Sequence, residues 1–110
     1  MQIHTNTPCC TVIVTVDGSN AAIAAVLAHA TSGLERFADH DGFLAGATHL
    51  SQDGTRIVQY LQWRDEAAYT ACMASPAWES IPSSRDFMHM MARGEIAVDA
   101  RVFGVTGCLG

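Results

Sequence analysis

The feature that most constrains the fold is a short turn between two runs of mostly apolar residues. The dipeptide Asp53-Gly54 separates these runs, and Asp-Gly flanked by apolar residues is typical of the type I′ turn of a two-residue β-hairpin. We therefore expect two antiparallel strands with Asp53 and Gly54 as the loop. In this register Leu44 lies opposite Trp63, and Thr48 lies opposite Gln59.

This hairpin brings one set of apolar side chains together, because side chains alternate between the two faces of a strand. Only Thr48 and Gln59 interrupt the set, and Trp63 stands at its rim. An apolar surface with a few polar groups is what a pocket for a mostly apolar ligand needs. The residues expected on this face are Leu44, Gly46, Thr48, Leu50, Ile57, Gln59, Leu61 and Trp63.

A strand and a helix are expected before the hairpin. Residues 9–16 are apolar and β-branched, which favours a strand that ends at Asp17-Gly18. Apolar residues then recur at helical spacing over 21–38, with Ser19 or Asn20 as the cap. Gly33 lies inside this helix and weakens it.

A broken helical region and a last strand are expected after the hairpin. Asp65 caps a helix that Ser75-Pro76 interrupts, and Pro82-Ser83-Ser84 interrupts the region again. One helical turn fits residues 77–81 and a short helix fits 85–91. Residues 96–105 read as the final strand.

The order β-α-β-β-α-β predicts a single α+β domain over residues 1–110, with the ferredoxin-like split βαβ arrangement and an antiparallel sheet. Its helices cover one face of the sheet, so the other face needs a cover. Hydrophobic residues make up 49% of the chain and charged residues 15%, which is rich in apolar surface. We therefore expect a homodimer in which two sheets pack into a dimeric α+β barrel.

Charge and composition exclude several classes of partner. The net charge is −5 and the basic residues are scattered, so neither nucleic acid nor an anionic membrane is expected as a partner. No apolar stretch has the length of a membrane span, and no export signal is recognisable. The four cysteines show no disulfide pattern, so we expect reduced thiols and a cytoplasmic protein.

No motif for a cofactor or a metal is found. The glycines fit neither the dinucleotide nor the phosphate-loop spacing, and the five histidines form no pair at metal-ligand spacing. His49 has the right reference pKa for a base, but the expected register puts it on the face opposite Gln59. Arg85 could anchor an anion beside the pocket, or could simply be solvated.

Three candidate site residues also have structural explanations. Trp63 could be a core residue rather than a ligand platform. Gln59 needs a partner or a ligand because it is an amide on an apolar face, and Thr48 could supply that partner. Tyr69 could pack with its hydroxyl at the surface, or aim it into the pocket.

The stretch GFLAGATHLSQDGTRIVQYLQW, followed by EAAY, resembles the antibiotic biosynthesis monooxygenase family over residues 41–69. The resemblance implies dimers of ferredoxin-like chains with a pocket between sheet and helices. It also implies oxidation of anthrone-type aromatics to quinones with molecular oxygen, without metal, flavin or nicotinamide. Trp63 and Tyr69 match pocket residues of the family, and Gln59 stands where asparagine is usual.

Two differences from the family and one related branch bear on the function. Thr48 stands where some members carry tyrosine, and Ser83 falls where an arginine is expected, with Arg85 nearby but unaligned. A haem-degrading branch of the superfamily needs a histidine in the helix after Trp63, and residues 66–81 contain none.

The leading hypothesis is a cofactor-independent monooxygenase acting on a small phenolic or polycyclic aromatic substrate. Trp63, Gln59 and Tyr69 are its expected catalytic residues. A non-catalytic dimer that binds an apolar metabolite is the alternative, as is a cyclase or isomerase that uses the same pocket. The residues expected to bind the substrate are Thr48, Leu44, Leu61 and Arg85.

Overall fold

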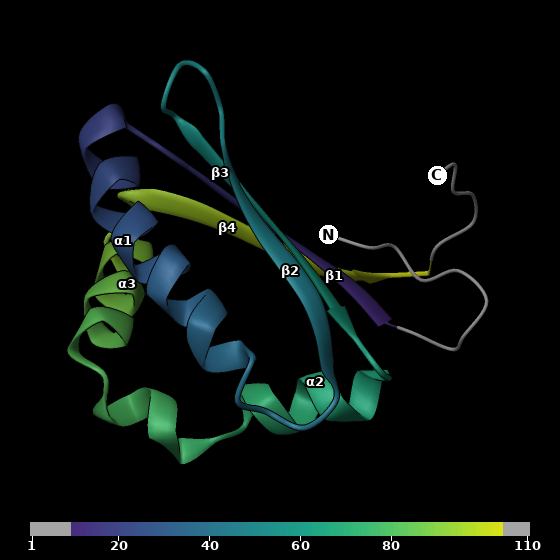
Figure 1. Ribbon diagram of the computed structural model, residues 1–110. Helices are drawn as coiled ribbons and strands as arrows, with labels where there is room; N and C mark the ends of the chain where they lie inside the picture. Colours follow the sequence, from purple (N-terminus) through teal and green to yellow (C-terminus); the bar gives the residue numbers. More distant parts are fainter. Residues whose placement is uncertain (1–9, 105–110) are drawn as a thin grey trace.

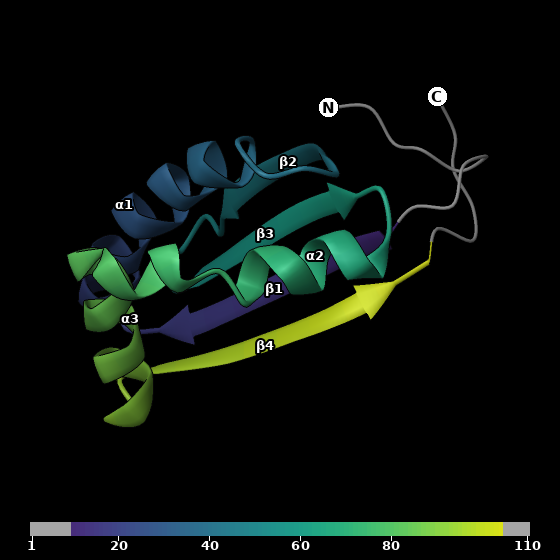
Figure 2. The ribbon, with the colours of Figure 1, turned by 90° about the horizontal axis from the view of Figure 1, so that it is seen from below.

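The computed structural model describes residues 10–104, without the side chains of Glu79 and Ser80. Four antiparallel strands form one sheet in the order β2-β3-β1-β4, and the helices lie on one face of it (Figures 1 and 2). This confirms the predicted ferredoxin-like α+β fold. The elements in chain order are β1 (Cys10–Gly18), α1 (Asn20–Phe37), β2 (Phe43–Leu50), β3 (Arg56–Trp63), α2 (Glu66–Met73), the 3₁₀ helix η1 (Pro76–Ser80), α3 (Pro82–Ala92) and β4 (Ile96–Phe103).

The first helix begins as its sequence predicts. The Ser19 hydroxyl accepts a hydrogen bond from the Ala22 backbone N–H at 3.2 Å, which satisfies one of the open donors of the first turn. The preceding strand continues through Asp17 and Gly18, because β3 pairs with it as far as Asp17 and β4 as far as Gly18. Gly33 is buried within an unbroken helix.

The hairpin has the predicted register near its turn, but the turn itself is different. Leu50 pairs with Ile57 and Thr48 with Gln59. The loop is closed by a hydrogen bond from the backbone N–H of Ser51 to the carbonyl of Arg56 at 2.9 Å. Among the described residues only glycines have positive φ. A type I′ turn would need positive φ at Asp53 as well. The Asp53 carboxylate instead accepts bonds from the Ser51 and Thr55 hydroxyls, which stabilises a wider loop.

A bulge at the far end of the hairpin contradicts the predicted pairing of Leu44 with Trp63. The register shifts between Phe43 and Ala45, so that Phe43 lies opposite Trp63. Phe43 therefore packs on the helix-covered face, with its ring 5.2 Å from the Trp63 ring. Leu44 is left 43% exposed. A bulge adds one residue to one strand and so reverses the facing of the residues beyond it.

One helix boundary after β3 differs from the prediction. Asp65 caps α2 as expected, accepting from the Ala68 N–H at 2.8 Å. Pro82, however, begins α3 rather than interrupting the region, so this helix starts three residues before the predicted Arg85. Proline suits the first helical position because the N–H it lacks would have no partner there. The expected strand ends at Cys9 and Val105 lie outside the described residues.

The core lies between the sheet and the helices. Val12, Leu61 and Trp63 are almost fully buried there, and Cys72 is 1% exposed, as expected of a small buried side chain. Burial raises the pKa of Cys72 to about 11. None of the described helices lies on the opposite face of the sheet (Figure 2), and Ile13, Val58 and Tyr60 on that face are partly exposed. No described helix is long and apolar enough to span a membrane.

Candidate functional site

A pocket of about 650 Å³ opens between the sheet and the helices. Its floor comes from β1, β3 and β4, and its walls come from α1, α2, η1 and α3. The floor residues are Val14, Val16, Ile57, Gln59, Val98 and Ala100. The wall residues are Val26, His29, Ala30, Gly33, Phe37, Tyr69, Met73, Trp78, Ser84, Arg85, Phe87, Met88 and His89. This is the size range of small-molecule sites, and the lining is mostly apolar.

Only part of the predicted site lines this pocket. Gln59, Tyr69 and Arg85 do so. Trp63 and Leu61 are buried in the core, where they pack with Phe37, which does reach the pocket.

Thr48 is linked to the pocket through Gln59. The hydroxyl of Thr48 accepts a hydrogen bond from Nε2 of Gln59 at 3.2 Å. Leu44 lies away from the pocket because of the bulge, on the exposed edge of β2.

The amide of Gln59 has a fixed orientation. Its Nε2 also donates to the backbone carbonyl of Ala30 at 3.1 Å. A carbonyl can only accept, so the nitrogen must point toward α1. Its Oε1 accepts no hydrogen bond from the described residues and is not fully buried. Gln59 lines the pocket and its nitrogen is engaged by Ala30 and Thr48, so its oxygen is the end of the amide left to accept a hydrogen bond.

Tyr69 supplies a protonated hydroxyl to the pocket wall. Burial raises its pKa above the ordinary value of 10.0, with smaller contributions from the nearby thiols of Cys10 and Cys72. Its ring lies 6.0 Å from that of Trp63. The hydroxyl makes no hydrogen bond within the described part of the chain, so it is available as a donor near neutral pH.

Trp78, Phe37 and His29 are among the pocket residues that the sequence did not indicate. Trp78 lines the pocket and its indole N–H donates to the Cys72 carbonyl at 2.7 Å. Phe37 belongs to the apolar residues that recur at helical spacing over 21–38, and no sequence pattern singles out His29. The one local signal for Trp78 was the pair of prolines, Pro76 and Pro82, that flank residues 77–81. They favour a short, compact helical turn there.

His29 and Ser83 join α1 to α3 at this pocket. The Nδ1 of His29 lies 2.9 Å from the Ser83 hydroxyl oxygen, and the imidazole packs on the Phe87 ring at 5.5 Å. Burial lowers the pKa of His29 below 6.5, and the positive charge of Arg36 lowers it further. His29 is therefore neutral at pH 7.

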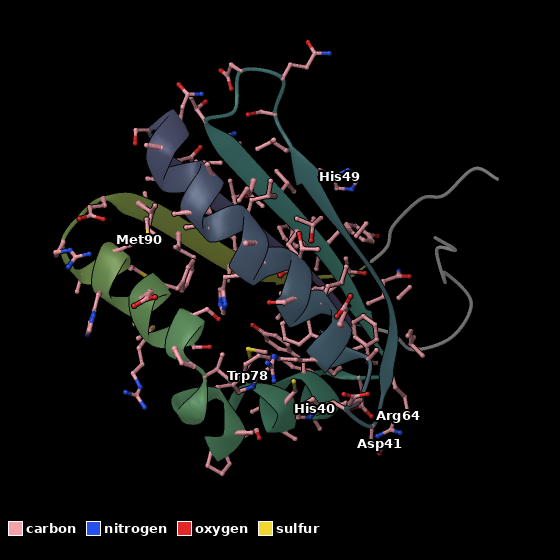
Figure 3. All side chains as sticks on the ribbon, turned by 60° about the vertical axis from the view of Figure 1, so that its left-hand side comes forward. His40, Asp41, His49, Arg64, Trp78 and Met90 are labelled. Atoms are coloured by element: carbon pink, nitrogen blue, oxygen red, sulfur yellow. The ribbon has the colours of Figure 1, made fainter. Side chains whose placement is uncertain are left out.

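Of the other described histidines, His89 of α3 also lines the pocket, whereas His49 and His40 do not. His49 is on the exposed side of β2, away from the helices, as its register predicts (Figure 3). His40 stacks on Trp78 with ring centres 6.2 Å apart (Figure 3). Within residues 10–104, no three His, Cys, Asp or Glu side chains are grouped to hold a metal ion.

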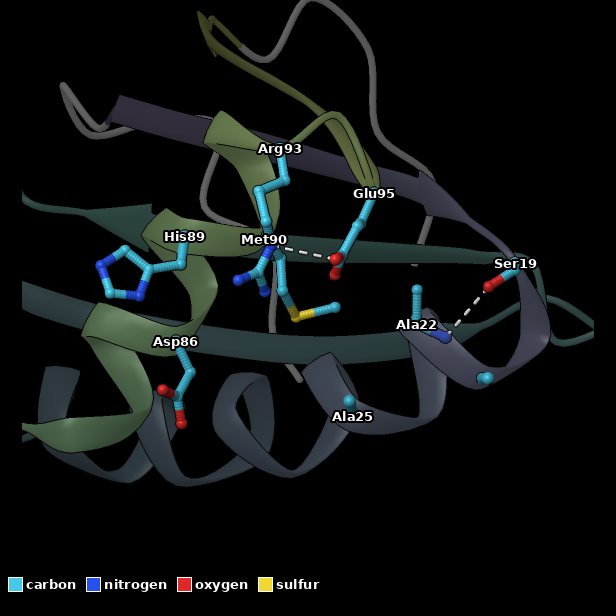
Figure 4. Close-up of a pocket in the computed structure, with 9 residues that line it drawn as sticks. Ser19, Ala22, Ala25, Asp86, His89, Met90, Arg93 and Glu95 are labelled. Carbon is cyan, nitrogen blue, oxygen red and sulfur yellow. Dashed lines mark hydrogen bonds and ion pairs between the residues drawn. The ribbon is translucent and has the colours of Figure 1, made fainter.

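A second hollow of about 500 Å³ lies between the start of α1 and the end of α3 (Figure 4). Alanines of α1 form one side, and an ion pair between Arg93 and Glu95 at 3.0 Å closes one end. It is more polar than the first pocket and contains none of the predicted site residues. The first pocket is therefore the candidate functional site.

The fold and the pocket define an α+β protein of ferredoxin-like topology with an apolar cavity under its helices. Residues 10–81 match the family model for antibiotic biosynthesis monooxygenases, and the chain belongs to that family. This confirms the resemblance found in residues 41–69. Tetracenomycin-F1 monooxygenase of Streptomyces glaucescens is 49% identical over 35 residues, which are 32% of this chain and 31% of that protein.

Solved structures show the same fold at low identity. A mutant of SnoaB, a cofactor-independent oxygenase from Streptomyces nogalater, is 20% identical with a TM-score of 0.67, and the match covers 94% of this chain and 98% of that one. The ActVA-Orf6 monooxygenase of Streptomyces coelicolor, in complex with nanaomycin D, is 23% identical with a TM-score of 0.61. That match covers 94% of this chain and 91% of that one.

Proposed function

We propose that this protein is a cofactor-independent monooxygenase that oxidises a small phenolic or polycyclic aromatic substrate of the anthrone type with molecular oxygen. The observation that carries the proposal is the mostly apolar pocket of about 650 Å³, whose lining includes the polar side chains of Gln59, Tyr69 and Arg85. Membership of the monooxygenase family supports it. So does the likeness to SnoaB, which is described as cofactor-independent.

The proposed reaction uses the pocket to form and protect a substrate anion. Loss of a proton gives an electron-rich enolate or phenolate, which passes one electron to oxygen. Recombination adds one oxygen atom to the substrate, and the other leaves as water with two hydrogens from the substrate. Apolar walls exclude bulk water from this anion, and fixed hydrogen-bonding groups orient it.

Individual residues have distinct parts in this proposal. The protonated Tyr69 hydroxyl donates to the carbonyl oxygen of the substrate, and Arg85 at the wall of α3 offers positive charge to the anion. Gln59 accepts from a substrate hydroxyl through its Oε1. Trp63 supports the aromatic wall from the core, through its edge-on contact with Phe37 at 5.9 Å.

A homodimer in the cytoplasm is part of the proposal. The sheet face away from the described helices presents Ile13, Val58 and Tyr60, whose partial exposure suits burial by a second sheet. Light scattering after gel filtration measures the mass directly. Twice the chain mass is expected for the wild type, and a shift toward a single chain is expected for Tyr60→Glu.

A second candidate function, a non-catalytic binder or an isomerase, is favoured by the orientation of Gln59. Its oxygen attracts a hydroxyl but repels an anion, so it does not itself stabilise an enolate. A binder would accept the same aromatic ligands without consuming oxygen.

Oxygen uptake separates these candidates. Purified metal-free protein is given dithranol, a simple anthrone, and uptake is measured beside quinone formation. Coupled uptake that falls in Tyr69→Phe and in Gln59→Ala supports the oxygenase. Binding of dithranol or nanaomycin D, followed by quenching of Trp78 fluorescence, with no uptake above the uncatalysed rate would instead support the binder or isomerase.

A further inference from the structure

His29 is the half-buried histidine of the candidate site, and its position depends on two helices. It projects from α1 into the wall of the pocket, while α3 supplies Ser83 and Phe87 as its neighbours. The hydrogen bond to Ser83 joins residues 54 positions apart in the chain. The imidazole is therefore held in place by tertiary structure rather than by its own helix.

The two ring nitrogens have different surroundings. Nδ1 lies 2.9 Å from the Ser83 hydroxyl oxygen, whereas Nε2 has no hydrogen-bond partner among the described residues. When Nδ1 carries the proton and donates it to Ser83, the lone pair is on Nε2. This is the arrangement of a base whose orientation is fixed by a second group.

His29 also lies next to the residue that orients Gln59. The carbonyl of Ala30, one position along α1, accepts the Gln59 amide N–H at 3.1 Å. His29 on the wall and Gln59 on the floor thus line the same pocket and are linked through neighbouring residues of α1. The pocket offers a substrate hydroxyl two acceptors, the Gln59 oxygen and the His29 imidazole.

We propose that His29 is the general base of the site and that Ser83 is its positioning residue. The O–H or the acidic C–H bond of the bound aromatic breaks, its electron pair stays on the substrate, and the proton passes to Nε2. The imidazolium later returns this proton to reduced oxygen as water leaves. This inference rests on the proposed function, because it names the base for that same pocket.

The charges around His29 fit this role. Burial and the charge of Arg36 lower its pKa, so that the neutral, proton-accepting form dominates at pH 7. After proton transfer, the substrate anion beside the imidazolium offsets the cost of a buried cation. The other titratable or charged groups that line the pocket with His29 are Tyr69 of α2 and Arg85 and His89 of α3, and Asp86 of α3 lines a smaller hollow of about 260 Å³ that His29 also borders.

Anaerobic titration of dithranol with the protein tests the base separately from the oxygen chemistry. Without oxygen, the only step is ionisation of the bound anthrone, which is followed by its visible absorbance. The wild type is expected to form the anion rapidly at pH 7. In His29→Gln the rate is expected to fall by about 10²-fold, the lower range for loss of a general base, with the affinity for dithranol nearly unchanged.

Two further variants and one rescue make the test specific. Ser83→Ala is expected to slow ionisation by less, about tenfold, and to change its pH profile because the imidazole loses the hydrogen bond that orients it. His49→Gln, the same substitution on the exposed side of β2, is expected to behave as wild type. Added imidazole is expected to restore part of the rate to His29→Gln, which a merely structural histidine would not allow.

Each outcome decides the proposal. An ionisation rate in His29→Gln equal to wild type, in protein with the wild-type circular dichroism, would overturn it. Anion formation that depends on His29, without oxygen uptake once air is admitted, would support the base and count against the oxygenase. Failure of the wild type to bind or ionise the anthrone would overturn both.

Discussion

The side-chain nitrogen of Gln59 donates to the backbone carbonyl of Ala30 at 3.1 Å, across the space between β3 and α1. This bond decides which end of the amide a ligand meets. Because the nitrogen is also shared with Thr48, both of its hydrogens are engaged and only the oxygen is presented. The amide therefore gives the pocket floor an acceptor, and we predict that the preferred ligand carries a hydroxyl there.

Replacing Gln59 by Leu should remove this preference. We expect the affinity for a hydroxyl-bearing anthraquinone to fall about tenfold, since one net hydrogen bond contributes about 1 kcal/mol. The affinity for the corresponding methoxy compound should stay within about twofold of wild type. Calorimetric titration of both ligands measures the difference. An equal loss for the two ligands would mean that the amide oxygen does not face the bound hydroxyl.

Gly33 should control how much of the pocket a ligand can use. A Cβ at this position would meet no atom within 4 Å, because the residue borders the pocket. Gly33→Ala should stabilise α1 by about 0.5–1 kcal/mol, through the backbone entropy that glycine loses on folding. Gly33→Leu should extend into the pocket and weaken dithranol binding by at least about tenfold.

Urea unfolding and ligand titration on both Gly33 variants separate stability from occupancy. The alanine variant is the matched control, since it gains the helical preference without filling the cavity. If the leucine variant binds the anthrone as well as wild type does, the ligand does not occupy this part of the pocket.

The sequence predicted the fold because its strongest patterns are local. Alternation along the hairpin and the helical spacing of α1 both follow from side chains that face the core. The caps at Ser19 and Asp65 are equally local, since each side chain bonds to a backbone N–H three residues away. These features needed no knowledge of the partner segments.

The site was predicted less completely because it depends on contacts between distant segments. The bulge at Leu44 adds a residue that no alternation pattern reveals, and it exchanges the facing of Leu44 and Phe43. The bond between His29 and Ser83 exists only once α1 and α3 lie side by side. Trp63 follows the predicted facing, but packing of Phe37 and Tyr69 around it separates it from the cavity.

Trp63 should therefore contribute to stability more than to ligand affinity. Its side chain is fully buried, and its Nε1 has no hydrogen-bond partner within the described residues. Trp63→Phe leaves a cavity but also removes an unpaired buried donor, so we expect a modest loss of about 1–2 kcal/mol in unfolding free energy. The dissociation constant for dithranol should change by less than about threefold.

Urea unfolding and ligand titration test this, with Trp78 as the remaining fluorescent reporter. Phe37→Leu is the comparison, because Phe37 belongs to both the core and the pocket and should affect both measurements. A tenfold loss of affinity in Trp63→Phe at unchanged stability would show that the indole contacts the ligand directly.

The lowered pKa of His29 makes stability depend on pH in a defined window. Burial disfavours the charged imidazole in the folded state, so the unfolded chain, with a pKa near 6.5, binds the proton more readily. The unfolding free energy should thus be highest above pH 6.5 and should fall as the pH is lowered through that value toward the lower folded pKa. Below both pKa values the loss is complete. In His29→Gln this loss of stability should be absent, whereas His49→Gln should keep it. Urea unfolding between about pH 5 and pH 8 measures the profiles of the wild type and the two variants. An identical slope in His29→Gln and wild type would mean that the imidazole is as well solvated in the folded protein as in the unfolded chain.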